Sequence, residues 1–370
     1  MTAARVPAPR LPDGLDTPCL VVDLDVVEAN ASRLQAALDT RGVRLRPHVK
    51  THKSVALARM QLEAGARGLT VGTLGEAEVF AAAGLTDLFV AYPIWAVGTK
   101  AGRLRALHDA IDLSVGVDSV AAAERLAAAV AGSSRPLRVV IELDSGGHRT
   151  GVGAAADVVG LARAATGLGL SVIGVFTHGG HSYGAIGVAA SAAQDEVRTL
   201  GAAAEALRSD GFEIELISAG STPTMVDSAM GPVTEIRAGT YLLGDRTQLA
   251  LGAIPAEGIA LHVAATVVSA AVPGEVVLDA GAKTLTKDRP PYLEGHGLLP
   301  AHPDAVIDRL YDYHGVVVAP THGALPHVGE VVAIIPNHVC PVVDLFDTFV
   351  ATRGGAIVGR WQVDARGRSG

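Results

Sequence analysis

One short basic cluster stands out in an otherwise acidic chain, the segment PHVKTHK at residues 47–53. Lys50 follows directly after a predicted buried strand, and Lys53 lies three positions further on. A lysine held at a strand end, away from water and beside other cations, has a lowered pKa and can bind an aldehyde as a Schiff base. We predict this role for Lys50 rather than Lys53, because Lys50 lies closer to the strand end. The alternative is an ordinary solvated loop.

A Schiff-base lysine indicates pyridoxal phosphate, a cofactor that also needs groups to hold its phosphate. The segment SAGSTPT follows another predicted strand and offers such groups. Gly220 lets the backbone approach closely, and Ser221 and Thr222 supply N–H and hydroxyl donors at an expected helix N-terminus. The alternative interpretation is that these residues form a simple turn.

Two further segments are expected near the same place. The sequence RAGTY carries the amides of Gly239 and Thr240, which would close the other side of the phosphate. In DSGGHRTG, Arg149 follows a buried strand and points at the same edge of the sheet. The alternative role for Arg149 is a structural ion pair with Asp144.

The elements that must position these residues are eight short runs rich in β-branched residues, which alternate with alanine-rich stretches of helical spacing. Such alternation is typical of parallel strands joined by helices, and eight units predict an α/β fold, the (β/α)8 TIM barrel. An open doubly wound sheet is disfavoured, because no G-x-G-x-x-G motif follows the first strand. The runs begin at Arg44, Gly68, Leu88, Asp112, Leu137, Ser171, Glu213 and Glu235. Barrel enzymes carry their chemistry at the C-terminal strand ends, where the segments above lie.

After about Leu251 the pattern changes to strands separated by Pro/Gly turns with little helix, which predicts a second, mostly antiparallel β domain. We therefore expect residues 24–255 to form the barrel and residues 256–370 the β domain. The strand TPCLVVDLD precedes both. Residues 1–23 either join the β domain or lead into the barrel.

Composition excludes several classes of protein. The 370 residues are 49% hydrophobic with a net charge of −8, which indicates a globular protein and disfavours a nucleic-acid partner. No apolar stretch reaches about 18 residues and no signal-like segment opens the chain, so we expect no membrane span and no secretion. The two cysteines, Cys19 and Cys340, lie far apart, so we expect no disulfide framework and a cytoplasmic location.

As a set and in this order, the chain's motifs resemble those of the D-threonine aldolase and D-serine dehydratase family, which has the alanine-racemase-like fold type III of pyridoxal phosphate enzymes. The resemblance begins at Asp16 and spans nearly the whole chain. It implies a barrel that holds the cofactor on Lys50, a β domain that carries a metal ion, and a homodimer. The motifs are PHVKTHK, DSGGHRTG, FTHGGHSYG, SAGSTPT, EIRAGTYLLGD, LDAGAKTLTKD and PNHVC.

The resemblance also implies roles for single residues. His178 would lie near the pyridine ring and Arg149 would hydrogen-bond to it, while His338 and Cys340 would bind the metal. Residues two apart on a strand share a face, so this pair could reach one ion, and a thiolate favours zinc, with manganese as the alternative. Without the family, a packed core pair is the alternative interpretation. The residues implied around the phosphate are Gly220, Ser221, Thr222, Gly239, Thr240 and Tyr241.

The implied substrate is a D-β-hydroxy-α-amino acid, for which two reactions stay open. In the first, a base removes the β-hydroxyl proton and the Cα–Cβ bond breaks, giving glycine and an aldehyde; we predict His181 as this base. In the second, Lys50 removes the α-proton of D-serine or D-3-hydroxyaspartate, and ammonia and a 2-oxo acid are released. Aldol cleavage of D-threonine-type substrates is our first expectation.

Two rival functions and one departure complete the sequence interpretation. A racemase needs a second base, for which Tyr292, Tyr311 and Tyr313 are candidates, whereas a non-catalytic cofactor carrier would resemble the barrel alone. Where many relatives carry Glu-Glu-His-Gly, this chain has Asp-Tyr-His-Gly at residues 312–315, which would alter the substrate pocket or the metal's surroundings. In LDAGAKTLTKD, we expect Asp279 and Lys283 to form a structural pair, with polar support of the metal site as the alternative.

Overall fold

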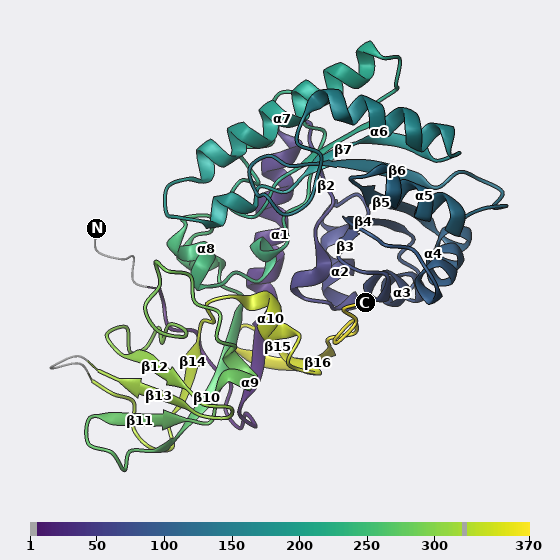
Figure 1. The fold of residues 1–370 in the computed structure, drawn as a ribbon. Helices are drawn as coiled ribbons and strands as arrows, with labels where there is room; N and C mark the ends of the chain where they lie inside the picture. Colours follow the sequence, from purple (N-terminus) through teal and green to yellow (C-terminus); the bar gives the residue numbers. More distant parts are fainter. Residues whose placement is uncertain (1–5, 320–323) are drawn as a thin grey trace. The chain divides into compact units, whose positions relative to one another are not determined.

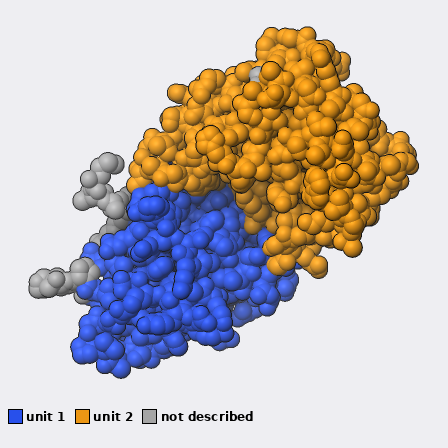
Figure 2. Space-filling view, viewed as in Figure 1, with its two compact units in different colours: residues 1–32, 51–56, 240–366 blue, residues 33–50, 57–239, 367–370 orange. Residues whose placement is uncertain are grey.

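The chain folds into two compact units, which are coloured separately in Figure 2. The structure is a computed structural model, and it describes residues 6–319 and 324–370. The barrel unit consists of residues 33–50, 57–239 and 367–370, and the β unit consists of the described residues of 1–32, 51–56 and 240–366. The predicted division into domains at 24–255 and 256–370 stays a prediction.

Eight parallel strands form the sheet of the barrel unit, in the order β2-β9-β8-β7-β6-β5-β4-β3. Figure 1 labels the strands from β2 to β7. A parallel bridge between His48, just after β2, and Thr70 in β3 joins the two ends of this order, so the sheet closes. Seven of the eight strands lie within the predicted runs, and β4 extends one residue beyond its run at each end. Their bounds are β2 (Arg44–Leu45), β3 (Leu69–Val71), β4 (Asp87–Pro93), β5 (Asp112–Val117), β6 (Arg138–Leu143), β7 (Ser171–Thr177), β8 (Leu216–Ala219) and β9 (Glu235–Ile236).

Helices follow most of these strands. They are α1 (Leu24–Asp39) before β2, and then α2 (Val55–Glu63), α3 (Leu74–Ala82), α4 (Thr99–Ala110), α5 (Val120–Ala129), α6 (Ala155–Gly167) and α7 (Ala189–Ser209). The expectation of a helix after every strand is wrong at one place, because residues 220–234, between β8 and β9, form turns. Pro223, Gly231 and Pro232 interrupt the helical pattern there.

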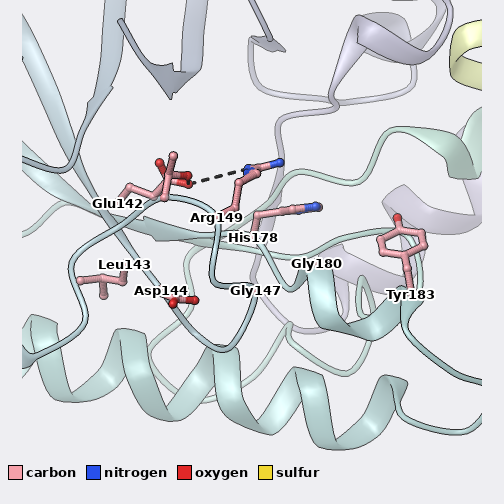
Figure 3. A pocket seen from close by; sticks show the side chains of 9 residues that line it. Glu142, Leu143, Asp144, Gly147, Arg149, His178, Gly180 and Tyr183 are labelled. Atoms are coloured by element: carbon pink, nitrogen blue, oxygen red, sulfur yellow. Dashed lines mark hydrogen bonds and ion pairs between the residues drawn. The ribbon is translucent and has the colours of Figure 1, made fainter.

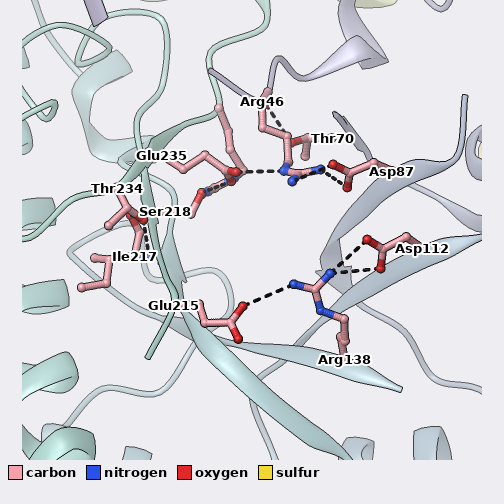
Figure 4. A network of polar contacts seen from close by, with 11 residues as sticks. Arg46, Thr70, Asp87, Asp112, Arg138, Glu215, Ile217, Ser218, Thr234 and Glu235 are labelled. Carbon is pink, nitrogen blue, oxygen red and sulfur yellow. Dashed lines mark hydrogen bonds and ion pairs between the residues drawn. The ribbon is translucent and has the colours of Figure 1, made fainter. Parts of the chain in front are cut away.

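The barrel interior combines an apolar cluster with a buried polar network. The rings of Phe89 and Phe176 meet edge to face, with centroids 5.1 Å apart, and they pack with Val140, Ile173 and Leu216. The polar network contains the ion pair of Arg46 and Glu235, in which the atoms Nε and Oε2 are 2.9 Å apart (Figure 4). The interior is therefore filled by side chains, as in other closed eight-stranded barrels.

The β unit is built on a second eight-stranded sheet, in the order β12-β13-β11-β10-β1-β15-β16, with β14 paired to β10. Its pairs are antiparallel except β1 with β15. The predicted fold class, a barrel and a mostly antiparallel β domain, is confirmed. The strands are β1 (Cys19–Asp23), β10 (Leu261–Ser269), β11 (Glu275–Leu278), β12 (Val306–Leu310), β13 (Gly315–Val318), β14 (Val331–Ile334), β15 (Thr348–Arg353) and β16 (Ala356–Gln362).

Two details of the β unit differ from the sequence interpretation or complete it. The strand before the barrel, β1, pairs with β10 and β15 and so belongs to the sheet of the β unit. The segment PNHVC is not a strand, because His338 is the N-cap of the short helix α10 (Val339–Val343). The remaining short helices are η1 (Val49–Thr51), η2 (Gly180–Tyr183), η3 (Thr240–Leu242), α8 (Arg246–Ala250), η4 (Ala256–Gly258) and α9 (Ala282–Leu285). Among the helices of 6–319 and 324–370, none is long and apolar enough to cross a membrane.

Candidate active site

Lys50 lies in the turn η1, directly after β2, and its side chain is exposed. Burial lowers the pKa of both His48 and His178 well below the usual value, and the charge of Lys50 lowers them further. The three residues therefore lie close together at the C-terminal ends of β2 and β7. Lys53 is engaged elsewhere, in the β unit, where its Nζ donates to Asp344 Oδ1 at 2.7 Å.

A cavity of about 210 Å³ lies beside His178 in the barrel unit (Figure 3). Arg149 lines it, with 63% of its side chain exposed, and its Nη2 is 3.9 Å from Oε1 of Glu142. Burial raises the pKa of the Glu142 carboxyl, although a hydrogen bond from Thr150 opposes this rise. The pocket can therefore hold a small molecule between a cation, an acid and a histidine ring. Its lining residues are Glu142, Leu143, Asp144, Gly147, Arg149, Thr150, His178, Gly180 and Tyr183.

Glu142 and Tyr183 were missed by the sequence interpretation. The ring centroid of Tyr183 is 6.4 Å from that of His178, so both rings belong to one wall of the pocket. A carboxylate near the end of the otherwise apolar strand VVIEL was the available signal for Glu142. Tyr183 lies within FTHGGHSYG, a motif from which only the histidines were singled out.

The predicted alternative for Arg149, an ion pair with Asp144, is wrong. Asp144 Oδ2 pairs with His148 Nδ1 at 2.8 Å, and Asp144 Oδ1 accepts the backbone N–H groups of Gly146 and His148. The Asp144 carboxylate therefore stabilises the loop in which it lies. The carboxylate that pairs with Arg149 is that of Glu142.

Arg237, the other arginine near the predicted phosphate segments, is buried in the barrel interior. Its guanidinium donates to Ser218 Oγ at 2.6 Å and to the carbonyl of Thr177 at 2.5 Å, and it lies 5.0 Å from the centroid of the Phe176 ring. Burial lowers its pKa, while nearby carboxylates, Glu235 first, oppose this. Arg149 therefore lines the pocket. The guanidinium of Arg237, in contrast, is engaged by Ser218 and Thr177 in the barrel interior.

His181 lies in η2, half-buried, with its Nε2 3.3 Å from Asp195 Oδ2. The pocket lining includes Gly180 and Tyr183 on either side of His181 but not His181 itself. Neither ring nitrogen of His181 has a hydrogen-bond partner within the described residues. A histidine beside a carboxylate can act as a general base, and this role of His181 stays a prediction.

The first predicted phosphate segment is a buried turn rather than a helix N-terminus. Ser221 and Thr222 are each 2% exposed, and the backbone N–H of Ser221 donates to Thr224 Oγ1 at 2.9 Å. Gly220 has a φ of +91°, which favours glycine, and its N–H donates to Glu196. Residues 220–234 form turns instead of the expected helix. The backbone N–H groups of Gly220 and Ser221 have protein acceptors, Glu196 and Thr224, whereas the first N–H groups of a helix have no partner within the helix. Gly239, at the end of the barrel unit, is buried.

The predicted metal residues lie together in the β unit. Cys340 Sγ donates to Thr51 Oγ1 at 3.3 Å and lies 3.8 Å from Thr240 Oγ1. Burial alone would lower the pKa of His338, but its contacts with Cys340 and Asp288 raise it to about 9. Cys340 is inside α10, so the two side chains meet across a helix start and not along a strand face. The neighbouring predicted phosphate residue Tyr241 is buried, with 2% of its surface exposed.

The predicted pair of Asp279 and Lys283 is wrong. Asp279 accepts hydrogen bonds from Thr17 Oγ1 at 2.7 Å and from the backbone N–H of Thr266 at 2.8 Å. Lys283 instead lies 3.3 Å from Asp312 Oδ2, and its Nζ donates to the Tyr313 hydroxyl at 3.1 Å. Asp312 and Tyr313, which depart from the family pattern, therefore contact Lys283, the first lysine of LDAGAKTLTKD.

The side chains of each unit fit the group predicted for it. In the barrel unit, a lysine beside neutral histidines and an arginine suits an anionic aldehyde with an aromatic ring. In the β unit, His338 and Cys340 offer one nitrogen and one sulfur donor, which suits a transition-metal ion. Within the part of the chain that the structure describes, no group of three or more His, Cys, Asp or Glu side chains could hold a metal. Water or substrate would therefore complete the coordination.

Comparison with known proteins finds similarity along most of the chain. The model of the alanine racemase N-terminal domain matches residues 22–247, and the model of a putative serine dehydratase domain matches residues 260–352. D-threo-3-hydroxyaspartate dehydratase of Delftia sp. (strain HT23) is 37% identical, over 94% of this chain and 97% of that protein. D-threonine aldolase of Arthrobacter sp. is 34% identical, over 96% of this chain and 94% of that protein. Among solved structures, a Cys-to-Ala mutant of D-threo-3-hydroxyaspartate dehydratase in the metal-free form superimposes with a TM-score of 0.86, at 35% identity over 94% of this chain and 97% of that chain.

Proposed function

Because the chain belongs to the alanine-racemase-like fold type III family of pyridoxal phosphate enzymes, we propose that it is a pyridoxal phosphate-dependent lyase of D-β-hydroxy-α-amino acids. The observation that carries the proposal is Lys50, placed beside His48 and His178 at the end of β2. When bound, the cofactor withdraws electrons from the α-carbon of an amino acid and stabilises negative charge there. The resemblance of the motifs is confirmed by the family models and by both relatives.

The chain's own residues would divide the work of holding the cofactor. Lys50 would hold its aldehyde carbon, and Arg149 would meet the ring, because the Arg237 guanidinium already donates to Ser218 and Thr177. The lowered pKa of His178 keeps its ring neutral at pH 7, so it can lie against an aromatic ring without adding charge. The proposed phosphate contacts are Gly220, Ser221, Thr222, Gly239, Thr240 and Tyr241.

We propose aldol cleavage of D-threonine-type substrates as the reaction. His181 would take the proton of the β-hydroxyl, the Cα–Cβ bond would break, and the products would be glycine and an aldehyde. Asp195 Oδ2 lies 3.3 Å from His181 Nε2, without a hydrogen bond in this structure, and its charge would stabilise the imidazole once it carries the extra proton. The D-threonine aldolase relative supports this assignment.

Dehydration is the second candidate, and the metal residues favour it. In that reaction Lys50 would take the α-proton and the β-hydroxyl would leave, and ammonia and a 2-oxo acid would be released. The relative that is 37% identical is a D-threo-3-hydroxyaspartate dehydratase, and a Cys-to-Ala mutant of a D-threo-3-hydroxyaspartate dehydratase was solved in a metal-free form. This chain has Cys340 in contact with His338, as a thiolate-containing metal site requires.

We propose His338 and Cys340 as ligands of one divalent ion, zinc first because of the thiolate and manganese as the alternative. Asp288 Oδ2 lies 2.8 Å from His338 Nδ1 and would fix the ring so that Nε2 faces the ion. The ion would lower the pKa of a β-hydroxyl placed on it, which helps both reactions.

The test uses borohydride, which fixes a lysine-bound cofactor covalently. Peptide mapping of the treated protein should find the adduct on Lys50. The Lys50→Ala variant should lose it, and the matched Lys53→Ala variant should keep it. An adduct that persists in Lys50→Ala would refute the assignment.

Product assays with D-threonine, D-serine and D-threo-3-hydroxyaspartate then separate the reactions. Glycine with an aldehyde identifies cleavage, and ammonia with a 2-oxo acid identifies dehydration. Inversion of a D-amino acid to its L form would support the racemase instead. Activity that survives both a chelator and Cys340→Ala would remove the metal from the proposal.

We further propose a homodimer in the cytoplasm. The family resemblance supports the dimer, and Cys19 and Cys340, which form no disulfide, suit a reducing compartment. Light scattering of the purified protein tests the dimer.

A further inference from the structure

A fully buried carboxylate, Glu196, joins the two loops that carry the proposed ring and phosphate contacts. It lies on α7, which packs against β7 and β8. Its Oε1 accepts the backbone N–H of Gly179 at 2.8 Å and that of Gly220 at 3.1 Å, and its Oε2 accepts the Ser228 hydroxyl at 2.6 Å. One side chain therefore connects the end of β7 with the end of β8.

The sequence position of Glu196 makes a purely packing role a poor explanation. The buried face of α7 is otherwise made of alanine and leucine, namely Ala192, Ala193, Leu200, Ala203, Ala204 and Leu207. Glu196 has an exposed fraction of 0% on that face. A carboxylate removed from water is costly unless hydrogen bonds satisfy it. Its two backbone donors and one hydroxyl supply those bonds, and both backbone donors belong to the loops of the site.

At each of the two glycines, an added side chain would meet a neighbouring residue. A Cβ added at Gly179 would lie 2.8 Å from Glu196 Cδ, so no larger residue fits without displacing the carboxylate. Gly220 has a φ of +91°, and a Cβ there would lie 3.0 Å from Ile236 Cγ2. Gly179 directly follows His178, and Gly220 directly precedes Ser221. A shift of either glycine would therefore move a proposed cofactor contact.

We propose that Glu196 is a positioning residue that sets the separation between the ring contact His178 and the phosphate contact Ser221. This inference rests on the proposed function, because it concerns how the chain holds pyridoxal phosphate at both ends. The cofactor's ring and phosphate are joined covalently, so a protein that fixes their two loops at the right spacing binds both without strain.

The test compares pyridoxal phosphate with pyridoxal, which lacks the phosphate. Dissociation constants of the cofactor-free protein for both compounds are measured by equilibrium dialysis, at a temperature at which circular dichroism shows every variant folded. In Glu196→Ala, both loop amides lose their acceptor. We expect the affinity for pyridoxal phosphate to fall at least about tenfold, the equivalent of one buried hydrogen bond left unmade, and the affinity for pyridoxal to change much less.

Three variants bracket this result. Glu196→Asp keeps the charge on a side chain that is one methylene too short to reach both amides, and it should behave like Glu196→Ala. In Glu196→Gln, the amide oxygen still accepts both N–H groups and the amide nitrogen can donate to Ser228, so most of the affinity should remain. Glu205→Ala removes an exposed glutamate of the same helix and should change neither constant.

The outcomes are distinguishable. If the unaltered protein binds no pyridoxal phosphate, the proposed function fails and the inference fails with it. If it binds the cofactor, but Glu196→Ala or Glu196→Asp weakens pyridoxal phosphate and pyridoxal equally, Glu196 only stabilises the fold and the positioning role is refuted. Unchanged binding of both compounds by folded Glu196→Ala also refutes the positioning role.

Discussion

Arg46 and Arg138 each connect two carboxylates within the barrel unit, but they differ in burial (Figure 4). Arg46 Nε is 2.9 Å from Glu235 Oε2, and its Nη1 is 2.5 Å from Asp87 Oδ1. Arg138 Nη1 is 3.0 Å from Asp112 Oδ1, and its Nη2 is 3.6 Å from Glu215 Oε2. The side chains of Arg46 and Glu235 are 13% and 0% exposed, whereas those of the Arg138 group are 36% to 69% exposed.

This difference predicts unequal losses of stability. In Arg46→Met, Glu235 keeps only the hydroxyl of Ser218 as a partner among the hydrogen bonds of the described chain. Removal of one partner from a buried ion pair costs up to about 3–5 kcal/mol. Here Arg237 still offsets part of the Glu235 charge, so the loss should lie at or below the lower end of that range. An exposed pair contributes about 0–1 kcal/mol, so Arg138→Met should cost no more than that. The two arginine-to-methionine changes remove the same groups, so each is the control for the other.

The assay must report on the barrel unit alone, since two units can unfold in separate transitions. Of the two tryptophans, Trp95 lies in the barrel unit and Trp361 in the β unit. In a Trp361→Phe background, urea unfolding followed by fluorescence therefore monitors the barrel unit. Free energies of unfolding of the two variants that differ by less than about 1 kcal/mol would refute the reasoning from burial.

Further predictions concern pH, packing and the metal. Burial lowers the pKa of His262 to about 4. The unfolded chain therefore binds a proton that the folded chain does not, and stability is lost as pH falls from about 6.5 towards 4. Between pH 7 and pH 5, urea unfolding should show that the unaltered protein loses about 2 kcal/mol more stability than His262→Leu, and equal losses would contradict this. A Cβ at Gly174 would lie 1.9 Å from the carbonyl oxygen of Leu216, so Gly174→Ala should destabilise the barrel by about 1–3 kcal/mol or more. In the control variant Gly167→Ala, the added Cβ meets nothing within 4 Å. Its stability in thermal unfolding should stay within about 1 kcal/mol of that of the unaltered protein. Asp288→Ala should weaken metal binding about 10- to 100-fold in a competition titration, because His338 loses the partner of its Nδ1, and an unchanged affinity would show that Asp288 has no such role.

The barrel strands could be predicted because their signal is local. Most of the buried parallel strands are short runs with β-branched residues, and even the two-residue strands β2 and β9 lie inside predicted runs, although that of β2 contains no β-branched residue. The position of Lys50 at the end of β2 could also be predicted from the local pattern, while its role as the Schiff-base lysine stays a prediction. The preference for Lys50 over Lys53 agrees with the ion pair that engages Lys53 with Asp344.

What failed depends on partners that are remote in the sequence or on the path of a loop. The segment VCPVV has the composition of a strand, yet it begins as a helix, because Asp245, 94 residues earlier, accepts the backbone N–H of Val339 at 3.1 Å. Arg149 does not pair with Asp144. The loop between them contains two residues with positive φ, Gly146 and His148, and the side chain of His148 contacts the Asp144 carboxylate instead. Neither contact is visible in the local pattern.

The place of β1 in the β unit has a consequence for how the protein is made. β1 lies between β10 and β15 in its sheet, and the Thr352 hydroxyl donates to the carbonyl of Val22 across a separation of 330 residues. During synthesis, β1 leaves the ribosome early and must wait for β15, while every strand of the barrel emerges in between. The barrel can therefore close on the nascent chain before β1 finds its neighbours. Pairing at this separation is slow, so completion of the β sheet should be the late step of folding.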